Sequence, residues 1–518
     1  MTHVGVPSVS LHAYLMPLLH SSVFSARASE LIGEHKVPGL ALALVHHGYI
    51  SSTALGQACL EPPRPCRTDT LFDIASASKS LTAASVALLV ADNENHPDVQ
   101  WHAKMSHLLP DDFVMQEQSY TNDVTVEDIL SHRTGLPSHD NSYLGVRAEF
   151  PDDARSITRN LRNLPLAAPI RTKYTYCNMM FTVATRLIEV GSGLQFPDYL
   201  EEQFFSKLGM ASTNLQPSRA RSKGFGERIA TGYAWNDEDG AYQVVDVLDS
   251  PEDQGAGSII TSVDDYILYV KAILQRTHPF TESVYDGLTQ SRTLVDPSHR
   301  HPKPFTSPLI YAAGWETYYY RGHQVVRHDG LIDGYGSTHF FLPAHDFGGV
   351  IFGNSEGIET VAEVLTNTII DELLDVPQHE RTDWNELSKQ QDAADDDNAD
   401  EQPEKVRQAL CPGIAEVRPQ TLPLDFYTGT YNNAGYHDLT VEVRDDRLFI
   451  DATDRSMGFI LTFDHVCDNS KYVVHLSDFQ TGGDDPLAAE FKFENDRAVS
   501  MGLHLEPDLK QYIWFDRK

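Results

Sequence analysis

The last hundred residues constrain the fold of this chain most strongly, because they hold strand-like segments and no helical pattern. From about residue 420, short stretches of alternating apolar and polar residues follow one another: FYTGTY, LTVEVRDD, RLFIDAT, FILTFDHV, KYVVHLS, AAEFKFEN, AVSMGLHL and QYIWFDR. Eight consecutive strands of this kind favour a small antiparallel barrel. We therefore predict a C-terminal β-barrel domain over residues 420–518.

The preceding part of the chain contains strands and helices that are segregated along the sequence. Residues 37–58 indicate a hairpin with its turn at His47-Gly48, and the stretch after about residue 309 is rich in strands. Apolar spacing and capping residues predict helices after Ser76 and within residues 124–137, 176–210, 258–276 and 358–375. Segregation of this kind predicts an α/β (α+β) fold, an antiparallel sheet with helices on its faces.

A charged segment separates these two parts. Residues 380–408 are poor in apolar residues and contain an acidic run, which is typical of a linker or disordered loop. The length of 518 residues also favours more than one domain. We expect an N-terminal extension over residues 1–29, a main domain over 30–378, a linker over 379–419, and the barrel.

Composition excludes several classes of partner. The formal net charge of −34 argues against nucleic acid and anionic membrane surfaces, and no run of 18 apolar residues predicts a membrane span. The five cysteines are few and widely spread, so we expect no disulfide framework and a cytoplasmic, reducing location. A bridge between Cys59 and Cys66 stays open. Neither cysteine nor histidine spacing predicts a metal site, and no cofactor is expected.

A Ser-x-x-Lys motif, Ser76-Ala77-Ser78-Lys79, lies where a strand-like run leads into a helix. A serine hydroxyl is a poor nucleophile until a neighbouring group takes its proton, and a lysine three residues later on a helix lies on the same face. A helix N-terminus would add backbone N–H groups and a positive dipole. The alternative is an ordinary helix-capping serine with a solvated lysine.

Two further motifs follow in order, Tyr176-Cys177-Asn178 and His328-Asp329-Gly330, with LSHRTGLP lying before the first. Taken singly, each has a plain structural explanation. The tyrosine can belong to the core, the asparagine can cap a helix, and the histidine can be hydrogen-bonded within the fold. We interpret Cys177 as a packing residue and not as a nucleophile.

Taken together, these motifs resemble the serine β-lactamase and penicillin-binding-protein superfamily, in its class C-like branch. That branch includes esterases, D-aminopeptidases and acyltransferases. The passages FSKLGMASTNL, QGAGSIITSVDDY and AAGWETY add to the resemblance, which covers residues 30–375. It implies a sheet flanked by helices plus a helical subdomain. The C-terminal part resembles the lipocalin-like domain of some relatives, and we expect it to shape the cleft mouth or to make a subunit contact.

The resemblance implies a role for each catalytic residue. Ser76 would attack a carbonyl and form an acyl-enzyme, and Lys79 would hold the hydroxyl and supply positive charge. Tyr176 would act as general base, which requires nearby cations to favour its phenolate. Alternatively, Tyr176 relays the proton and a neutral Lys79 is the base.

The resemblance also implies a substrate-binding set: Asn178, His328, Gly330 and Leu331. Asn178 would fix Lys79 or a substrate amide, and the backbone N–H groups of Ser76 and Leu331 would form an oxyanion hole. True β-lactamases have a lysine where this chain has His328. A histidine is only fractionally charged near pH 7, and Asp329 adds negative charge, so we expect poor recognition of anionic β-lactams.

These observations predict a metal-independent serine hydrolase that cleaves a small-molecule ester, lactone or amide. One alternative is an acyltransferase, in which an alcohol or amine replaces water. Another is a non-catalytic protein that has kept the fold. The sequence leaves open whether the chain forms a homo-oligomer.

Overall fold

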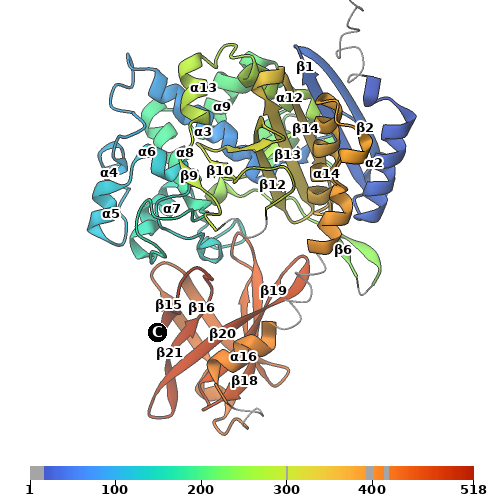
Figure 1. Cartoon of the computed structure of the whole chain (residues 1–518). Helices are drawn as coiled ribbons and strands as arrows, with labels where there is room; N and C mark the ends of the chain where they lie inside the picture. Colours follow the sequence, from blue (N-terminus) through green and yellow to red (C-terminus); the bar gives the residue numbers. More distant parts are fainter. Residues whose placement is uncertain (1–16, 238, 299–301, 392–401, 414–418) are drawn as a thin grey trace, which may run out of the picture. The chain divides into compact units, whose positions relative to one another are not determined.

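The computed structural model describes residues 17–237, 239–298, 302–391, 402–413 and 419–518. These residues form two compact units. Figure 1 labels their helices and strands. The first unit draws on Met1–Asp92, Ser192–Leu248 and Gly257–Lys389. The second draws on Asn93–Gly191, Asp249–Ala256 and Gln390–Lys518. Each unit is therefore built from segments that are distant in sequence.

The first unit is organised around a nine-stranded antiparallel sheet. In spatial order the strands are β3 (Arg64–Pro65), β2 (Tyr49–Cys59), β1 (Gly39–His46), β14 (Phe347–Gly353), β13 (Tyr335–Leu342), β12 (His323–Ile332), β11 (Glu316–Tyr320), β10 (Ile310–Tyr311) and β9 (Thr293–Leu294). Strands β1 and β2 form the predicted hairpin, with His46 paired to Tyr49 across the His47-Gly48 turn. The predicted antiparallel sheet is confirmed.

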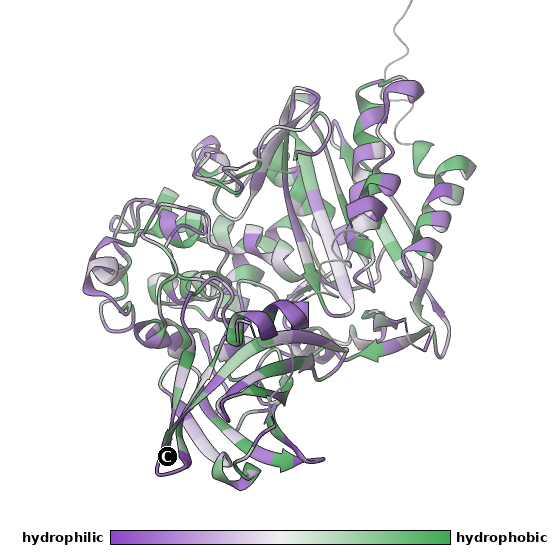
Figure 2. Cartoon of the chain, turned by 60° about the horizontal axis from the view of Figure 1, so that its bottom comes forward, coloured by the Kyte–Doolittle hydropathy of each residue, from purple (hydrophilic) through white to green (hydrophobic). Residues whose placement is uncertain are grey.

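Helices cover both faces of this sheet. The helices α2 (Ser22–Glu34) and α14 (Ile358–Leu373) pack with Leu40, Leu42 and Leu44 on one face. On the other face, Tyr266 of α12 (Val263–Leu274) contacts Phe352, the cross-strand partner of Ala41. Because both faces are covered, β1 is buried throughout and its sequence is a continuous apolar run. Figure 2 shows the sheet strands mostly green or pale and the flanking helices with purple stretches among the green.

Smaller elements complete the first unit. One three-stranded sheet joins β4 (Phe72–Asp73), β8 (Ile259–Thr261) and β5 (Asn214–Leu215), and β6 (Gly232–Asn236) pairs with β7 (Ala241–Val245). The helices here are α3 (Lys79–Ala91), α9 (Phe196–Leu200), α10 (Ser206–Leu208), α11 (Pro217–Ser222) and α13 (Glu282–Thr289). Helix α12 lies within the predicted range 258–276 and starts after Ser262, whose side chain accepts a hydrogen bond from the Asp265 backbone N–H.

The second unit begins with short helices: α4 (Met105–Leu108), α5 (Gln118–Asp123), α6 (Val126–Ile129), α7 (Ala154–Asn160) and most of α8 (Met179–Ser192). Helix α6 is shorter than the helix predicted within 124–137. A Thr125–Asp128 capping box starts it, and His132 soon adopts a left-handed conformation (φ 54°). Within the described residues, every helix is too short or too polar to cross a membrane.

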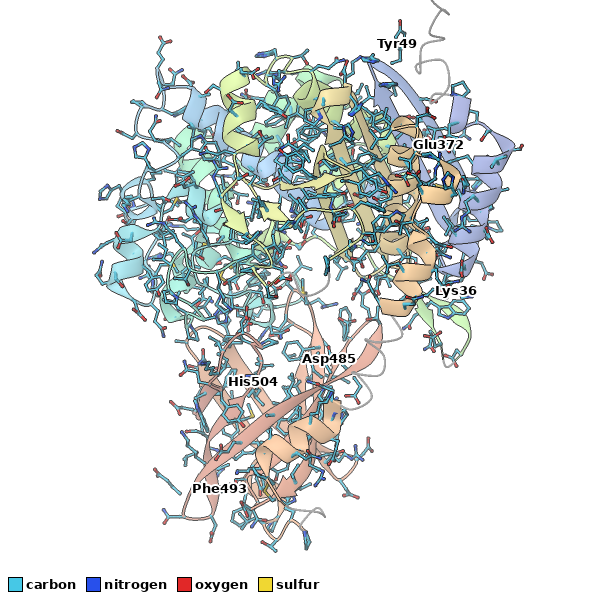
Figure 3. All side chains as sticks on the ribbon, viewed as in Figure 1. Lys36, Tyr49, Glu372, Asp485, Phe493 and His504 are labelled. Atoms are coloured by element: carbon cyan, nitrogen blue, oxygen red, sulfur yellow. A yellow bond between two sulfur atoms is a disulfide. The ribbon has the colours of Figure 1, made fainter. Side chains whose placement is uncertain are left out.

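The rest of the second unit is a closed eight-stranded barrel, as predicted. Its strands are β15 (Gly429–Asn433), β16 (His437–Arg444), β17 (Arg447–Ala452), β18 (Phe459–Cys467), β19 (Lys471–Asp478), β20 (Gly482–Glu494), β21 (Arg497–Leu503) and β22 (Ile513–Arg517). Pairing of Tyr431 with Arg517 closes the barrel. Figure 3 labels Asp485 and Phe493, which lie at opposite ends of β20.

The segment expected to be a linker is partly structured. Its acidic run, residues 392–401, lies outside the described residues, but α16 (Gln402–Leu410) packs on β19 and β20. Cys411, directly after α16, forms a disulfide with Cys467 of β18. Cys59 and Cys66 are free, so the alternative of a bridge between them is wrong. Apolar packing of Leu410 and Val473 around the disulfide explains why this helix forms.

Reduction of the Cys411–Cys467 bond is expected to destabilise the barrel by about 4 kcal/mol, because the bond closes a loop spanning 56 residues. The measurement is chemical denaturation with and without reductant, and with Cys411→Ser. Cys59→Ser, which removes a free thiol of the first unit, is the control. An unchanged midpoint for Cys411→Ser would contradict this expectation.

Candidate active site

Ser76 lies in a tight turn between β4 and α3. The turn is a 3₁₀ helix, Ala75–Ser78, and α3 begins only at Lys79. Ala75 is buried with φ 46°, a strained value for a residue other than glycine. Its backbone N–H donates to the Asp73 carboxylate at 2.8 Å. Neither the turn nor α3 has a side-chain cap, so the sequence alternative of a capping serine does not apply.

Lys79 is positioned to act on Ser76. Its Nζ donates to the Ser76 Oγ at 2.9 Å. Lys79 is completely buried, whereas Ser76 is partly exposed. Burying an ammonium group is costly unless polar partners stabilise it. The pair therefore combines a solvent-accessible hydroxyl with a buried lysine side chain.

Strand β12 lies directly against the Ser76 turn at Gly330. A Cβ atom on Gly330 would lie 2.1 Å from the Ile74 carbonyl oxygen and 2.9 Å from the Ala77 nitrogen. The neighbouring strand adds a hydrogen bond, from Ser337 Oγ to the same Ile74 oxygen at 2.7 Å. Only glycine permits this approach. Leu331 follows it, with 45% of its surface exposed.

His328 is buried on the same strand and is fully hydrogen-bonded. Its Nδ1 donates to the Asp329 carbonyl oxygen at 2.6 Å, so its Nε2 accepts from the Tyr311 hydroxyl at 2.8 Å. Burial and the nearby Lys79 charge lower the pKa of His328 to about 4. The histidine is therefore neutral at pH 7, which corrects the expectation of a fractional charge.

The charge of Asp329 is also balanced. Its carboxylate pairs with Arg327 at 3.2 Å and accepts from Thr338 Oγ1 at 2.5 Å. The expected negative charge beside His328 is thus part of an ion pair on the opposite face of the strand. Within the first unit, Ser76, Lys79, His328 and Gly330 are brought together around one turn.

Tyr176 and Asn178 lie together in the second unit. The Tyr176 ring packs against His132 at a centroid distance of 4.3 Å, and His132 Nδ1 accepts the Cys177 backbone N–H at 3.0 Å. Asn178 donates from Nδ2 to the Asp140 carboxylate at 3.2 and 3.3 Å. Its buried Oδ1 has no hydrogen-bond partner among the described residues. Cys177 is buried, and burial raises the pKa of its thiol, as expected for a packing residue.

The LSHRTGLP segment is anchored beside Tyr176 by a buried carboxylate. Asp128 accepts from Arg133 Nε at 2.6 Å and from Arg171 Nη2 at 2.6 Å. Burial opposes ionisation, but the hydrogen bonds from Arg171 and Thr125 hold the pKa of Asp128 below its ordinary value. One carboxylate thus ties together two loops that flank Tyr176.

The barrel contacts this same region. Glu506 Oε2 accepts from Ser138 Oγ at 3.1 Å and from the His139 backbone N–H at 2.8 Å. The Ser456 backbone N–H donates to the Tyr143 carbonyl oxygen at 3.1 Å. The motifs did not identify Glu506, Asp140 or Tyr311, because none of these residues belongs to a recognisable local pattern. Within the described ranges, no group of three or more His, Cys, Asp or Glu side chains could hold a metal ion.

Asp73 makes the stability of the turn depend on pH. Burial raises the pKa of its carboxyl from 3.8 to about 6, although the hydrogen bond from the Ala75 backbone N–H lowers this pKa. Between these values the folded state binds more protons than the unfolded chain, so stability falls as pH rises through this window. Asp73→Asn is expected to increase the free energy of unfolding at pH 8 by up to about 3 kcal/mol and to have little effect near pH 4. Equal effects in thermal unfolding at both pH values would contradict this.

Known proteins share this architecture. The Beta-lactamase family model matches residues 24–372, and a domain of unknown function, DUF3471, matches residues 415–517. The unguisins hydrolase ungD' of Aspergillus campestris is 35% identical over 96% of this chain and 91% of its own length. A D-aminopeptidase of Brucella anthropi is 27% identical over 51% of this chain and 47% of its own length.

The solved structures agree on the fold. The octameric penicillin-binding protein homologue from Pyrococcus abyssi aligns with a TM-score of 0.59 at 17% identity. The alignment covers 95% of this chain and 98% of that protein. With the family model matching most of the chain and a related hydrolase that is 35% identical aligned along nearly all of it, the chain is a hydrolase that belongs to the β-lactamase family.

Proposed function

We propose that this protein hydrolyses peptide-like amides through an acyl-enzyme on Ser76. The observation that carries the proposal is the 2.9 Å hydrogen bond from the buried Lys79 Nζ to the partly exposed Ser76 Oγ. A covalent intermediate divides one difficult displacement into two easier ones. A lysine shielded from solvent next to the hydroxyl supplies the positive charge that this chemistry needs.

In the proposed reaction, Ser76 Oγ attacks the amide carbonyl carbon and loses its proton to a general base. The backbone N–H groups of Ser76 and Leu331 stabilise the oxyanion, which is supported by the close contact of Gly330 with the Ser76 turn. The C–N bond then breaks and the leaving amine takes the proton. Water attacks the resulting ester in the same way and releases the acid.

We assign the general base to Tyr176, with Lys79 favouring its phenolate form; the alternative is a neutral Lys79. Asn178 is proposed to bind the substrate amide or Lys79 through its Oδ1, since its Nδ2 is already committed to Asp140. Both assignments route the proton through the Tyr176 hydroxyl, because in the alternative the tyrosine relays the proton to Lys79. Tyr176→Phe is therefore expected to abolish turnover, and substantial residual activity in this variant would remove Tyr176 from the proton path.

The substrate class follows from charge and from the relatives. His328 is neutral and held by Tyr311, so it offers no cation to a substrate carboxylate. This argues against efficient hydrolysis of anionic β-lactams. One relative is a hydrolase of unguisins and another is a D-aminopeptidase. The second name favours an amide substrate over an ester or a lactone for this chain.

The test is labelling with a fluorophosphonate, followed by mapping of the modified peptide and a substrate panel. We expect the label on Ser76 and the highest kcat/KM on D-amino-acid amides or peptides, compared with p-nitrophenyl esters, lactones and nitrocefin. Added amines or alcohols test for transfer, because a pure hydrolase yields only the acid. Label on another residue, or no turnover of any amide, would refute the proposal.

We further propose that the barrel positions Asn178. Glu506 holds residues 138–139, and the adjacent Asp140 holds Asn178. Glu506→Gln weakens charge-assisted hydrogen bonds, and we expect kcat/KM on an amide to fall about tenfold. The exposed Glu494, replaced by glutamine, is the matched control. Equal rates for both variants would contradict a positioning role.

A further inference from the structure

A cavity lies in the first unit, on the face of β12 away from His328. Its volume is about 180 Å³. Arg327 lines it, and because successive side chains of a strand point to opposite faces, His328 belongs to the other side of the sheet. The cavity is therefore separate from the Ser76 site, with the backbone of β12 between them.

Besides β12, the cavity is lined by β11, α14 and the loop over residues 302–309, together with Asp296 before that loop and Trp384 after α14. Lys303 in the loop forms an ion pair with Glu363 of α14. The Ser307 backbone N–H donates to the Tyr319 carbonyl oxygen at 2.8 Å, which ties the loop to β11. These contacts build a defined site from well-separated parts of the sequence.

The wall carries charges of both signs. Lys303 and Arg327 supply cations, and Glu363 and Asp296 supply carboxylates. Apolar surface comes from Leu309, Tyr318 and Trp384. Lys303 is already paired with Glu363, and Arg327 with Asp329. A singly charged ligand that enters the Lys303–Glu363 pair would leave one of the two side chains unpaired, whereas a ligand with one ammonium and one carboxylate group would pair with both.

The indole N–H of Trp384 independently indicates that a polar ligand binds in this cavity. Only 4% of its surface is exposed, and its buried Nε1–H has no hydrogen-bond partner among the described residues. A buried donor left unsatisfied costs about 1–3 kcal/mol, and such groups in native proteins call for an explanation. A carboxylate bound between Trp384 and Arg327 would satisfy it.

We propose that this cavity binds a free α-amino acid with an apolar side chain. The carboxylate accepts from the Trp384 Nε1–H and from Arg327 or Lys303, and the ammonium group binds Glu363. The side chain packs on Leu309 and Tyr318. This site is independent of acyl-enzyme chemistry at Ser76.

The test is calorimetric titration of the full chain with leucine and phenylalanine in both D and L forms, after fluorophosphonate treatment to block Ser76. We expect saturable binding, together with a shift of the Trp384 indole N–H resonance that follows the same isotherm. Loss of the resonance in Trp384→Phe assigns it. N-acetyl-leucine and leucine amide, which each lack one charge, should bind at least tenfold more weakly.

Two variants test the contacts. Trp384→Phe keeps a ring but removes the donor, and Lys303→Met removes a cation at the edge of the cavity; each should weaken binding about five- to tenfold. Lys207→Met, at an exposed lysine of α10, should bind normally. Absence of saturable binding at millimolar amino acid, or equal binding by all three variants, would overturn the proposal. If Ser76 is not labelled, the proposed hydrolase mechanism fails while the titration still tests this cavity.

Discussion

Replacing Ser76 with alanine is expected to lower kcat/KM for an amide by roughly 10⁴- to 10⁶-fold and to abolish fluorophosphonate labelling. The hydroxyl is the only group of the proposed mechanism that forms a covalent bond to the substrate. The backbone N–H groups and the binding surface remain in the variant, so a small residual rate over water is expected. Steady-state kinetics and intact-mass measurement of the label provide the check.

The matched control is Ser78→Ala. Ser78 lies in the same 3₁₀ turn, is completely buried, and accepts the Ile259 backbone N–H at 3.3 Å. Its loss removes a structural hydrogen bond of about 1 kcal/mol but no reacting group. We expect Ser78→Ala to be labelled and to turn over substrate. Turnover by Ser76→Ala at the unmodified rate would remove Ser76 from the mechanism.

Elements with a strong local pattern were predictable from the sequence. The β1–β2 hairpin follows from its apolar run and the His47-Gly48 turn, and the barrel strands follow from alternation with a period of two. Helix α12 follows from Ser262 and the acids of its first turn. In each case residues that are close together in the sequence determine the element, so contacts with distant residues are not needed to predict it.

The features that were missed depend on contacts between distant residues. The Cys411–Cys467 bond joins the end of α16 to β18. The carboxylate of Glu506 accepts a hydrogen bond from the backbone N–H of His139. The lowered pKa of His328 comes from burial and from Lys79, which lies far away in the sequence. Helix α3 follows Ser76 as predicted, but a 3₁₀ turn over Ala75–Ser78 precedes it, and the contacts of this turn with Asp73 and Gly330 lie outside the motif.

Gly330→Ala is expected to damage the active site although it adds a single methyl group. The new Cβ would lie 2.1 Å from the Ile74 carbonyl oxygen, so β12 and the Ser76 turn must separate. Overpacking of this kind destabilises a fold by about 1–3 kcal/mol. Separation also moves Leu331 relative to Ser76, and misplacing one proposed oxyanion donor lowers kcat by about 10²- to 10³-fold.

Gly33→Ala separates this effect from the general consequences of replacing a glycine. Gly33 lies in α2, and a Cβ there would meet no atom within 4 Å. Alanine is favoured over glycine in a helix by about 1 kcal/mol, so this control should be slightly stabilised and fully active. Thermal unfolding gives the stability change, and kcat at saturating amide gives the catalytic one. If Gly330→Ala lost stability but kept its kcat, the contact between β12 and the turn would serve packing alone, and the oxyanion role proposed for Leu331 would fail.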